Sequence, residues 1–398
     1  MSLLKRAAKE LEDFRDIADD VTEEDFVPYA CHYNPYTLLT KNGELVQTLK
    51  IVGYSYELIT GNADDLRSMI RRALRNSVKT TEYAVWFHTI RRRENLMPGG
   101  NEHPQGFSRI LNEAWRDANG WDHKFINEVY VTLVRQGEPA RALHAKDFAR
   151  ALLPALDNRA RWQYLRRASA EMNRVVEGLL EQLQVFGVRR LGLVEKDGQI
   201  YSEPLQFLSK LVRLVDEEQP LPEEDLSQHL AKRSEVTFGF NAMEVRDSLT
   251  GKRRFGAMLA LKEYKDIPLE VIDTFLQVPV EFITSQCLDF INKDRALKVY
   301  KYQEEIFRIS QCTDLAERTG LPQILASDTG SATDFGEHQI NIFLLADTVP
   351  ELEETVALTV GALRSLGIMA FREDVFMEDG YWALLPGNFP FLKRLRPI

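Results

Sequence analysis

A phosphate-binding loop is the first chemistry to look for in this sequence, because its residue types and spacing are specific. Such a loop needs glycines, whose backbone amides approach the phosphates, followed by Lys and then Ser or Thr. The only Gly-Lys pair in the chain is Gly251-Lys252, which is followed by Arg253 and has no glycine five residues upstream. The pair also lies in a predicted hairpin turn. We therefore reject it as a nucleotide-binding loop.

Metal and nucleophile motifs are also missing from the sequence. The seven histidines show no metal-ligand spacing, and there is neither an H-E-x-x-H nor a G-x-S-x-G motif. Asp334-Phe335-Gly336 matches the metal-binding tripeptide of protein kinases, but none of the companion motifs is present, so we interpret the match as coincidence. The sequence therefore predicts no catalytic, cofactor-binding or metal-binding residue in this chain.

Two residue types point to ordinary structural roles. His88 shares one face of a predicted strand with Trp86 and Ile90, which predicts a partly buried histidine with its hydrogen bonds satisfied. The three cysteines are an odd number without a C-x-x-C pair, which is typical of reduced thiols in the cytosol.

Basic residues occur in short runs, but each run is offset by nearby acids. A groove for nucleic acid would interleave such residues with exposed aromatic side chains. Trp86 and Phe87, next to Arg91–Arg93, come closest to this pattern, but they are typical of a strand core. We therefore expect no direct contact with nucleic acid.

Composition supports a folded protein in the cytoplasm. The chain has 398 residues, of which 44% are hydrophobic and 28% charged, with a formal net charge of −10. No run approaches the roughly 18 apolar residues that span a bilayer. Residues 1–25 carry nine acidic and four basic side chains, a sum of −5. This acidic N-terminal arm is interpreted either as a solvated helix or as a docking segment for a basic partner.

The first half of the chain has clear element signals. Asn42-Gly43 between two β-rich runs, 36–40 and 45–52, predicts a hairpin. The hairpin is followed by a helix that starts after Asn62 and by strands over 83–90 and 129–134. A long helix is predicted over 159–186. Asp197-Gly198 predicts a second hairpin, and 205–214 a helix.

The second half repeats this order. Strands are predicted over 238–245 and 255–261, a short helix over 268–276, a strand over 278–288 and a long helix over 293–318. A strand over 339–346, a helix over 349–366 and a strand over 367–372 complete it. The fold class is α+β, with two related split-βαβ-like sheets, each with helices packed on one face, plus long helices and an N-terminal acidic helix. We expect an arm at 1–25, one subdomain at 26–220 and another at 221–398, because 216–225 is rich in acid and proline.

Three segments resemble the N-terminal region of the VirB-type type IV secretion ATPases, the CagE/TrbE/VirB family. Thr37–Gln47 (TLLTKNGELVQ) is similar to the "LTKxGxLxQ" opening of that family. Asn127–Arg135 (NEVYVTLVR) resembles its characteristic strand, and Tyr381–Asn388 (YWALLPGN) is close to its "LPGN" segment. Their order and their span from 37 to 388 cover nearly the whole chain.

The resemblance implies a docking and oligomerisation domain. In the family, the "LPGN" segment leads into a P-loop ATPase domain, whereas this chain stops at Ile398. We therefore expect this chain alone to be no enzyme, with ATP and Mg²⁺ belonging only to the missing C-terminal domain. The implied partners are inner-membrane subunits of a type IV secretion channel, other secretion ATPases and further copies arranged in a ring, as in a hexamer. The implied location is the cytoplasmic face of the bacterial inner membrane.

Two alternatives stay open at this point. One is a free-standing cytosolic enzyme whose site is assembled from scattered residues, which a concave pocket with convergent acids or bases would favour. The other is a truncated paralogue that competes for the same membrane partners.

Overall fold

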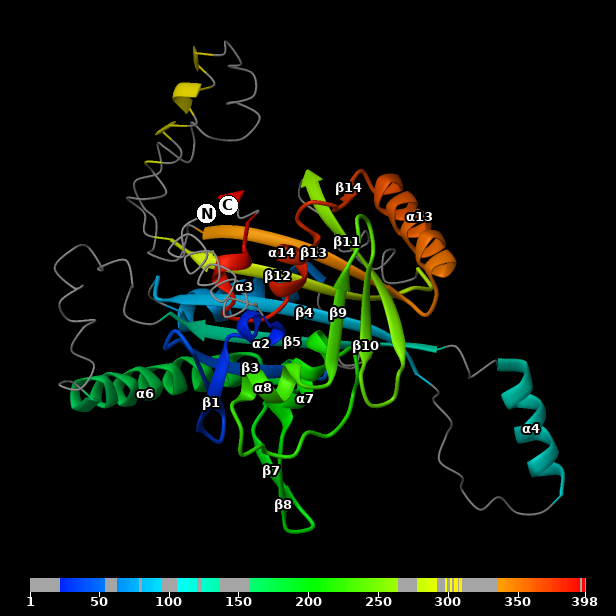
Figure 1. Ribbon diagram of the computed structural model, residues 1–398, viewed down its shortest axis with the longest axis horizontal. Coiled ribbons are helices and arrows are strands. Elements are labelled where there is room, and N and C mark those ends of the chain that lie inside the picture. The colour runs from blue at the N-terminus through cyan, green and yellow to red at the C-terminus, as the bar shows by residue number, and fades with distance from the viewer. Residues whose placement is uncertain are drawn as a thin grey trace, which may run out of the picture.

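An antiparallel sheet of 13 strands organises the chain (Figure 1). The computed structural model describes residues 22–53, 63–78, 81–94, 106–119, 124–136, 158–263, 278–291, 336–393 and 396–397, with short pieces between 298 and 309. Helices accompany the strands throughout this part of the chain. The α+β class expected from the sequence is therefore confirmed.

The first half comprises the elements up to α7. Its strands are β1 (Tyr29–Asn34), β2 (Thr37–Thr40), β3 (Leu45–Ile51), β4 (Tyr83–Glu94), β5 (Lys124–Arg135), β6 (Val188–Arg190), β7 (Leu193–Lys196) and β8 (Gln199–Ser202). Its helices are α2 (Glu23–Phe26), α3 (Ala63–Ser77), α4 (Phe107–Asn119), α6 (Asn158–Gln182), the 3₁₀ turn η4 (Gln184–Phe186) and α7 (Glu203–Val212). Both predicted hairpins are confirmed, and Gly43 and Gly198 have the positive φ that such turns require.

The second half follows the short helix α8 (Leu226–Ala231). Its strands are β9 (Ser234–Phe238), β10 (Met243–Asp247), β11 (Arg253–Glu263), β12 (Glu281–Phe290), β13 (Gly336–Ala346), β14 (Met369–Arg372) and β15 (Arg396–Pro397). Its helical elements are α13 (Val349–Ser365), α14 (Met377–Trp382) and the 3₁₀ turn η5 (Phe389–Phe391). The strand predicted over 238–245 was wrong as a single element, because the chain reverses at Gly239 and forms the β9–β10 hairpin.

The strand order reads β1-β2-β3-β5-β4-β12-β13-β11-β10-β9. Within it, β5 lies between β3 and β4, and β13 lies between β11 and β12, which is the split order expected for each half. The two halves meet where β4 pairs antiparallel with β12, from Ala84–Asp289 to Arg91–Phe282. The expected two sheets are therefore corrected to one, because the long edge strands of the halves satisfy each other's backbone groups.

The order of elements shows that the halves repeat each other. In each half a two-strand extension precedes the split unit: β1 and β2 in the first half, β9 and β10 in the second. A helix then follows the inserted strand, α6 after β5 and α13 after β13, and a short strand returns to the sheet, β6 to β3 and β14 to β11. A further helix follows in both halves: α7 comes after the β7–β8 hairpin in the first half, and α14 comes directly after β14 in the second. The architectural repeat expected from the sequence is thus present in the structure.

The two faces of the sheet are covered differently. On one face, called face 2 here, α6 packs on the first half through Met172 and Val176, and α3 packs there through Ala73. Helix α13 packs on the same face of the second half through Leu352 and Leu363. This matches the expected helices on one face. The opposite face, face 1, also carries helices, which corrects that expectation.

The layer on face 1 draws on both halves. It consists of α2, α7, α8, α14 and η5, and we call it the shared layer; α7, α8 and α14 lie in front of the strands in Figure 1. Its core joins Trp86 and Tyr130 of the first half to Met258 and Phe343 of the second. The strands carry alternating residues to the two faces, so a single apolar core spans the junction between β4 and β12.

Some expectations fall on other parts of the chain. The acidic arm up to residue 21, the helix expected over 268–276 and most of the helix expected over 293–318 lie outside the described residues. The boundary expected near residue 220 stays a prediction.

Candidate functional site

The segment Tyr381–Asn388, called the closing segment here, connects the second half to the first. The hydroxyl of Tyr29 donates to the carbonyl oxygen of Pro386 at 2.8 Å. The side-chain amide of Asn388 donates to the carbonyl oxygens of Phe26 and Trp382 at 2.9 and 3.0 Å. The ring of Trp382 stacks on Phe26 with 4.9 Å between centroids. The chain therefore crosses from α14 to the face-1 side of the first half.

Gly387 lies where the three segments that resemble the family in sequence meet. We call Thr37–Gln47 the motif hairpin and Asn127–Arg135 the motif strand, and the third is the closing segment. Its φ is +90°, a backbone conformation that side chains other than glycine rarely adopt. A Cβ at this position would lie 3.6–3.8 Å from methyl groups of Thr40, Val46 and Val134. Thr40 and Val46 belong to the motif hairpin and Val134 to the motif strand, so segments far apart in sequence converge on one glycine.

His88 connects the closing segment to the junction between the halves. The residue is fully buried, and its Nε2–H donates to the carbonyl oxygen of Leu384 at 2.7 Å. Burial lowers the pKa of His88 to about 4, and the hydrogen bond opposes this only in part. His88 shares the face of Trp86 as expected, but it is fully and not partly buried. The expectation that its hydrogen bonds are satisfied was also wrong, because its Nδ1 has no hydrogen-bond partner among the described residues. The side chain is neutral near pH 7.

A buried ion cluster lies on face 1 of the first half. The carboxylate of Glu128 on β5 accepts from Lys50 of β3 at 2.5 Å and from Lys210 of α7 at 2.6 Å. Lys210 also contacts Asp216 at 3.0 Å and donates to the hydroxyl of Tyr130 at 3.2 Å. The ammonium lies 5.8 Å from the centre of the Tyr130 ring. The cluster ties α7 to the strands beneath it.

The electrostatics of this ion cluster oppose acid–base catalysis. Burial by itself raises the pKa of Glu128, but the hydrogen bonds from Lys210 and Lys50 outweigh it and lower the pKa to about 2. Burial and the adjacent Glu128 raise the pKa of Tyr130 well above its ordinary value. A general acid or base works best with a pKa near the working pH, and neither group meets that condition. The arrangement is suited to holding elements together.

A second ionic network crosses the junction of the halves. Glu281 of β12 accepts from the backbone N–H of Arg93 at 2.7 Å and from the side chain of Arg254 at 2.6 Å. Arg93 also pairs with Glu351 of α13 at 2.7 Å. The Arg91–Arg93 run is therefore engaged with acidic residues and with the ring of Phe125, which lies 4.6 Å from the Arg91 guanidinium.

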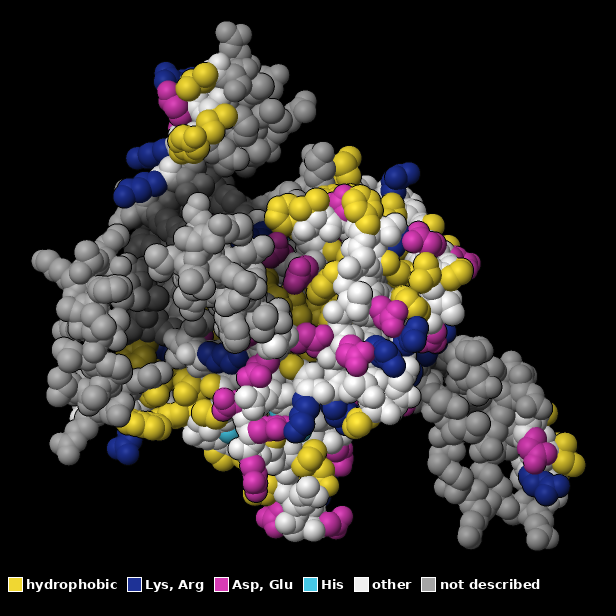
Figure 2. All heavy atoms as spheres, viewed as in Figure 1, with side chains coloured by type: hydrophobic (Ala, Val, Ile, Leu, Met, Phe, Trp, Pro, Cys, Tyr) yellow, Lys and Arg dark blue, Asp and Glu magenta, His cyan; other side chains and the backbone are white. Residues whose placement is uncertain are grey.

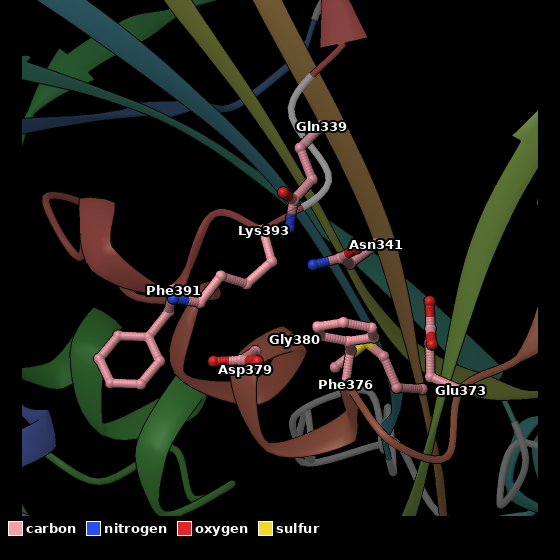
Figure 3. A pocket seen from close by; sticks show the side chains of 9 residues that line it. Gln339, Asn341, Glu373, Phe376, Asp379, Gly380, Phe391 and Lys393 are labelled. Atoms are coloured by element: carbon pink, nitrogen blue, oxygen red, sulfur yellow. The ribbon is translucent and has the colours of Figure 1, made fainter.

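A pocket lies on face 1 of the second half, between the strands and α14 (Figure 3). The space that it encloses is about 10 Å³, which is room for about one water molecule and too little for a small-molecule ligand. Polar groups converge on it from β13, from the end of β14 and from α14. The lining residues are Met258, Gln339, Asn341, Glu373, Phe376, Asp379, Gly380, Phe391 and Lys393.

Several sequence expectations can now be placed. The Gly251-Lys252 pair lies in the turn between β10 and β11, where Gly251 has φ +66°. Asp334 and Phe335 lie outside the described residues. The Glu128 cluster and the pocket were not found from the sequence. Tyr130 lies on the strand predicted over 129–134 and Glu128 lies one residue before it, but nothing in the sequence connects either residue to Lys210.

Among the residues that the structure describes, no group of three or more His, Cys, Asp or Glu side chains could hold a metal ion. Among the same residues, no helix is both long and apolar enough to cross a membrane. In Figure 2, the described Lys and Arg side chains on the visible face are interspersed with Asp and Glu.

Comparison with known families agrees with this geometry. Residues 189–394 match the model of the CagE, TrbE, VirB family, component of type IV transporter system. The chain belongs to this family. Residues 36–142 match the model of the type IV secretion system ATPase VirB4/TrbE, N-terminal domain. The second match holds the motif hairpin and strand, and the first holds the closing segment, so the two matched regions contact each other at Gly387.

Individual relatives give the same assignment at low identity. The chain is 25% identical to the type IV secretion system protein virB4 of Bartonella henselae, over 93% of this chain and 47% of the relative. It is 24% identical to the type IV secretion system protein PtlC of Bordetella pertussis, over 93% and 44%, respectively. It is 22% identical to the protein virB4 of Agrobacterium tumefaciens, over 94% and 46%. The chain thus spans about half the length of the curated relatives it matches.

Proposed function

We propose that this chain is the docking and oligomerisation domain of a type IV secretion or conjugation ATPase. In this role it links the motor to the inner-membrane complex that drives substrate transfer and pilus assembly. Its partners are inner-membrane subunits, other secretion ATPases and further copies of itself in a ring, and it sits peripherally at the cytoplasmic face of the membrane. It makes no direct contact with nucleic acid.

The observation that carries the proposal is the closing segment, together with the family membership of the chain. Residues 381–388 are held by Tyr29, His88 and Phe26 of the first half. A force applied to the chain after Asn388 would also reach both halves of the sheet, because Phe389 packs on Trp86 of β4 and β15 pairs with β13. A domain that transmits movement between a motor and a membrane complex needs such a connection.

In this role the chain alone does not hydrolyse ATP, and ATP and Mg²⁺ bind to a part of the ATPase outside it. The strongest titratable cluster supports this, because the pKa of Glu128 is far from neutrality. The pocket is also smaller than a nucleotide requires. ATP turnover that survives ion exchange and copurifies with the chain would contradict this part of the proposal.

Docking is tested by charge reversal in the acidic arm. Glu23 accepts a hydrogen bond from the backbone N–H of Val236 at 2.5 Å, so it must be left intact. The test protein therefore carries Lys at positions 16, 19, 20 and 24 only. A matched control carries Lys in place of four exposed acids elsewhere, namely Glu177, Glu181, Glu195 and Glu354.

We expect the arm variant to lose copurification with the inner-membrane subunits and the control to keep it. If both proteins copurified equally well with the inner-membrane subunits, the arm would be only a solvated segment and not a docking segment. Self-association is measured separately by sedimentation of the unmodified chain. A monomer at tens of micromolar would contradict the oligomerisation part of the proposal.

A further inference from the structure

A small antiparallel ribbon projects from the first half next to α7, at the lower end of Figure 1. Strands β7 and β8 form its hairpin. The N–H of Leu221 donates to the carbonyl oxygen of Ile200 at 2.9 Å, so the segment after α7 adds a third extended stretch to the hairpin. We call residues 193–202 together with residues 216–225 the acidic ribbon, because they contain eight acidic side chains and one lysine.

One face of the acidic ribbon combines apolar and acidic side chains. Glu195 lies opposite Ile200 on one side and Leu221 lies opposite it on the other, so these three side chains share a face. Ile200 is 46% exposed and Leu221 36%. Four acidic residues of the ribbon are exposed and pair with no Lys or Arg in the described part of the chain: Glu195, Asp197, Glu223 and Asp225. Figure 2 shows Asp and Glu side chains at the tip and along both sides of this hairpin.

The exposed side of α6 carries the opposite charge. Arg166, Arg167 and Arg174 are exposed and lie away from the buried stripe of the helix. Among the described residues, none of these three arginines pairs with a carboxylate. Trp162, one turn before Arg166, is 58% exposed, and its ring stacks on Tyr33 with 6.4 Å between centroids. We call Trp162 and these three arginines the α6 outer face.

The acidic ribbon and the α6 outer face lie on different sides of one molecule. Helix α6 packs on face 2 of the sheet, whereas α7, which the ribbon segments flank, packs on face 1. Each surface has exposed apolar side chains next to unpaired charge of one sign. Opposite charges guide two surfaces into register, and Trp and Arg are enriched at the centres of protein interfaces. The chain therefore carries both partners of a complementary pair.

We propose that the acidic ribbon of one copy docks on the α6 outer face of a second copy. Trp162 packs on Ile200 and Leu221, and the arginines pair with the surrounding carboxylates. Because the contact joins two different surfaces, each bound copy keeps one surface for the next copy, which is the kind of contact that builds rings. This inference rests on the proposed self-association of the chain and names the two surfaces that meet.

Two variants each disrupt one surface. The ribbon variant carries Ile200→Lys with Glu223→Lys, and the α6 variant carries Arg166→Glu with Arg167→Glu. We expect each variant to weaken self-association at least about tenfold, because each loses attraction and places like charges opposite one another. Sedimentation velocity over a concentration series measures the change. Association of the unmodified chain should also weaken in 1 M NaCl, which screens the charges.

Matched controls carry the same kinds of substitution on other helices. One carries Leu358→Lys with Glu354→Lys on α13, and the other carries Arg71→Glu with Arg72→Glu on α3. All four of these residues are exposed, as are those changed in the two variants. Both controls should associate like the unmodified chain.

Mixing the two variants tests the pairing of the surfaces directly. The ribbon variant keeps its α6 outer face and the α6 variant keeps its ribbon, so one intact contact can form between them. We expect a 1:1 pair that grows no further, because the two remaining surfaces are disrupted. Formation of this pair also shows that both variants are folded.

Weakened association of both variants, together with the 1:1 pair in the mixture, would support the proposal. Unchanged association of either variant, equal weakening in the controls or no pairing in the mixture would overturn it, while self-association of the chain would still stand. A monomeric unmodified chain would overturn both. If the ribbon variant kept self-association but lost copurification with the inner-membrane subunits, the ribbon would bind a basic partner and the assignment to a second copy would be wrong.

Discussion

The two faces of the sheet are packed according to different rules. On face 2 each half is covered by its own helices, α3 and α6 for the first and α13 for the second, and two separate apolar clusters result. On face 1 one cluster runs across both halves and includes α7, α8 and α14. Face 2 therefore stabilises each half, while face 1 and the β4–β12 pairing hold the halves together.

This difference indicates where a domain of this kind can transmit strain. A contact within face 2 affects one half, because its neighbours belong to that half. The closing segment and Tyr381, whose hydroxyl donates to the carbonyl oxygen of Val212 at 2.7 Å, connect helices of different halves. Substitutions on the two faces should therefore differ in how far their effects extend.

The largest effect is expected from Lys210→Met on face 1. The substitution removes one cationic partner of the buried Glu128 carboxylate, while Lys50 at 2.5 Å and Arg92 at 3.6 Å stay. Because these partners still compensate part of the charge, we expect the loss of unfolding free energy to lie near the lower end of the about 3–5 kcal/mol that breaking a buried ion pair costs. Urea denaturation measures this loss, and hydrogen exchange should show reduced protection in β12 and β13 as well as in β5.

Lys196→Met provides the control. Lys196 belongs to the β7–β8 hairpin, is exposed and pairs with Glu218, which follows α7, so its removal should change stability little. Loss of protection confined to the first half in the Lys210 variant would contradict the idea that face 1 couples the halves.

His88 should give the next largest effect, as a dependence of stability on pH. Its pKa is about 4 in the folded chain against 6.5 for the free side chain, so the unfolded chain binds more protons between these values. Stability is therefore present above pH 6.5 and is lost as the pH falls towards 4, by about 3 kcal/mol for a shift of this size. His88→Gln, whose amide can still donate to Leu384, should remove this contribution.

His338 supplies the comparison on face 2. Burial lowers the pKa of His338 to about 4 as well, so His338→Gln should remove a contribution in the same pH window. Denaturation at pH 4.5, 5.5 and 6.5 measures both. An unchanged pH slope in the His88 variant would mean that this residue is not buried as a neutral imidazole.

Gly387→Ala is expected to destabilise by about 1–2 kcal/mol, mostly through the backbone. The new Cβ would make only ordinary contacts with Thr40, Val46 and Val134, so the cost comes from φ +90°. Gly361→Ala in α13 has open space around it and should instead stabilise by about 0.5–1 kcal/mol. Thermal unfolding of the pair distinguishes strain at the closing segment from a general effect of removing glycine.

The local elements were largely predictable from the sequence. The turn at Asn42-Gly43 follows from the need for positive φ, and α6 follows from an apolar stripe that includes Leu165, Met172 and Val176. The repeat was also visible, since the order of hairpin, helix and strands recurs. A turn or an amphipathic helix is specified by residues only a few positions apart, so the sequence alone is sufficient to predict it.

The junction and the sites were less predictable, for a physical reason. Pairing of β4 with β12 joins residues about 200 apart, and each strand alone is equally typical of a sheet edge. Lys210 and Glu128 are likewise separated by 82 residues, so no spacing rule relates them. The pocket depends on the small size of Gly380 and on the position of Glu373 after β14. Both matter only once α14 has packed on the strands, which the sequence does not show.

The smallest effect is expected on face 2, from Glu353→Gln. Arg372 of β14 donates to Glu353 of α13 at 2.8 and 2.9 Å, and the carboxylate is 52% exposed. Such a surface pair contributes less than about 1 kcal/mol and is screened by salt. The loss should therefore vanish in 1 M NaCl, and reduced protection should stay within α13 and β14. Spread of the effect to β3 or β5 would show that face 2 also couples the halves, and the distinction between the faces would then fail.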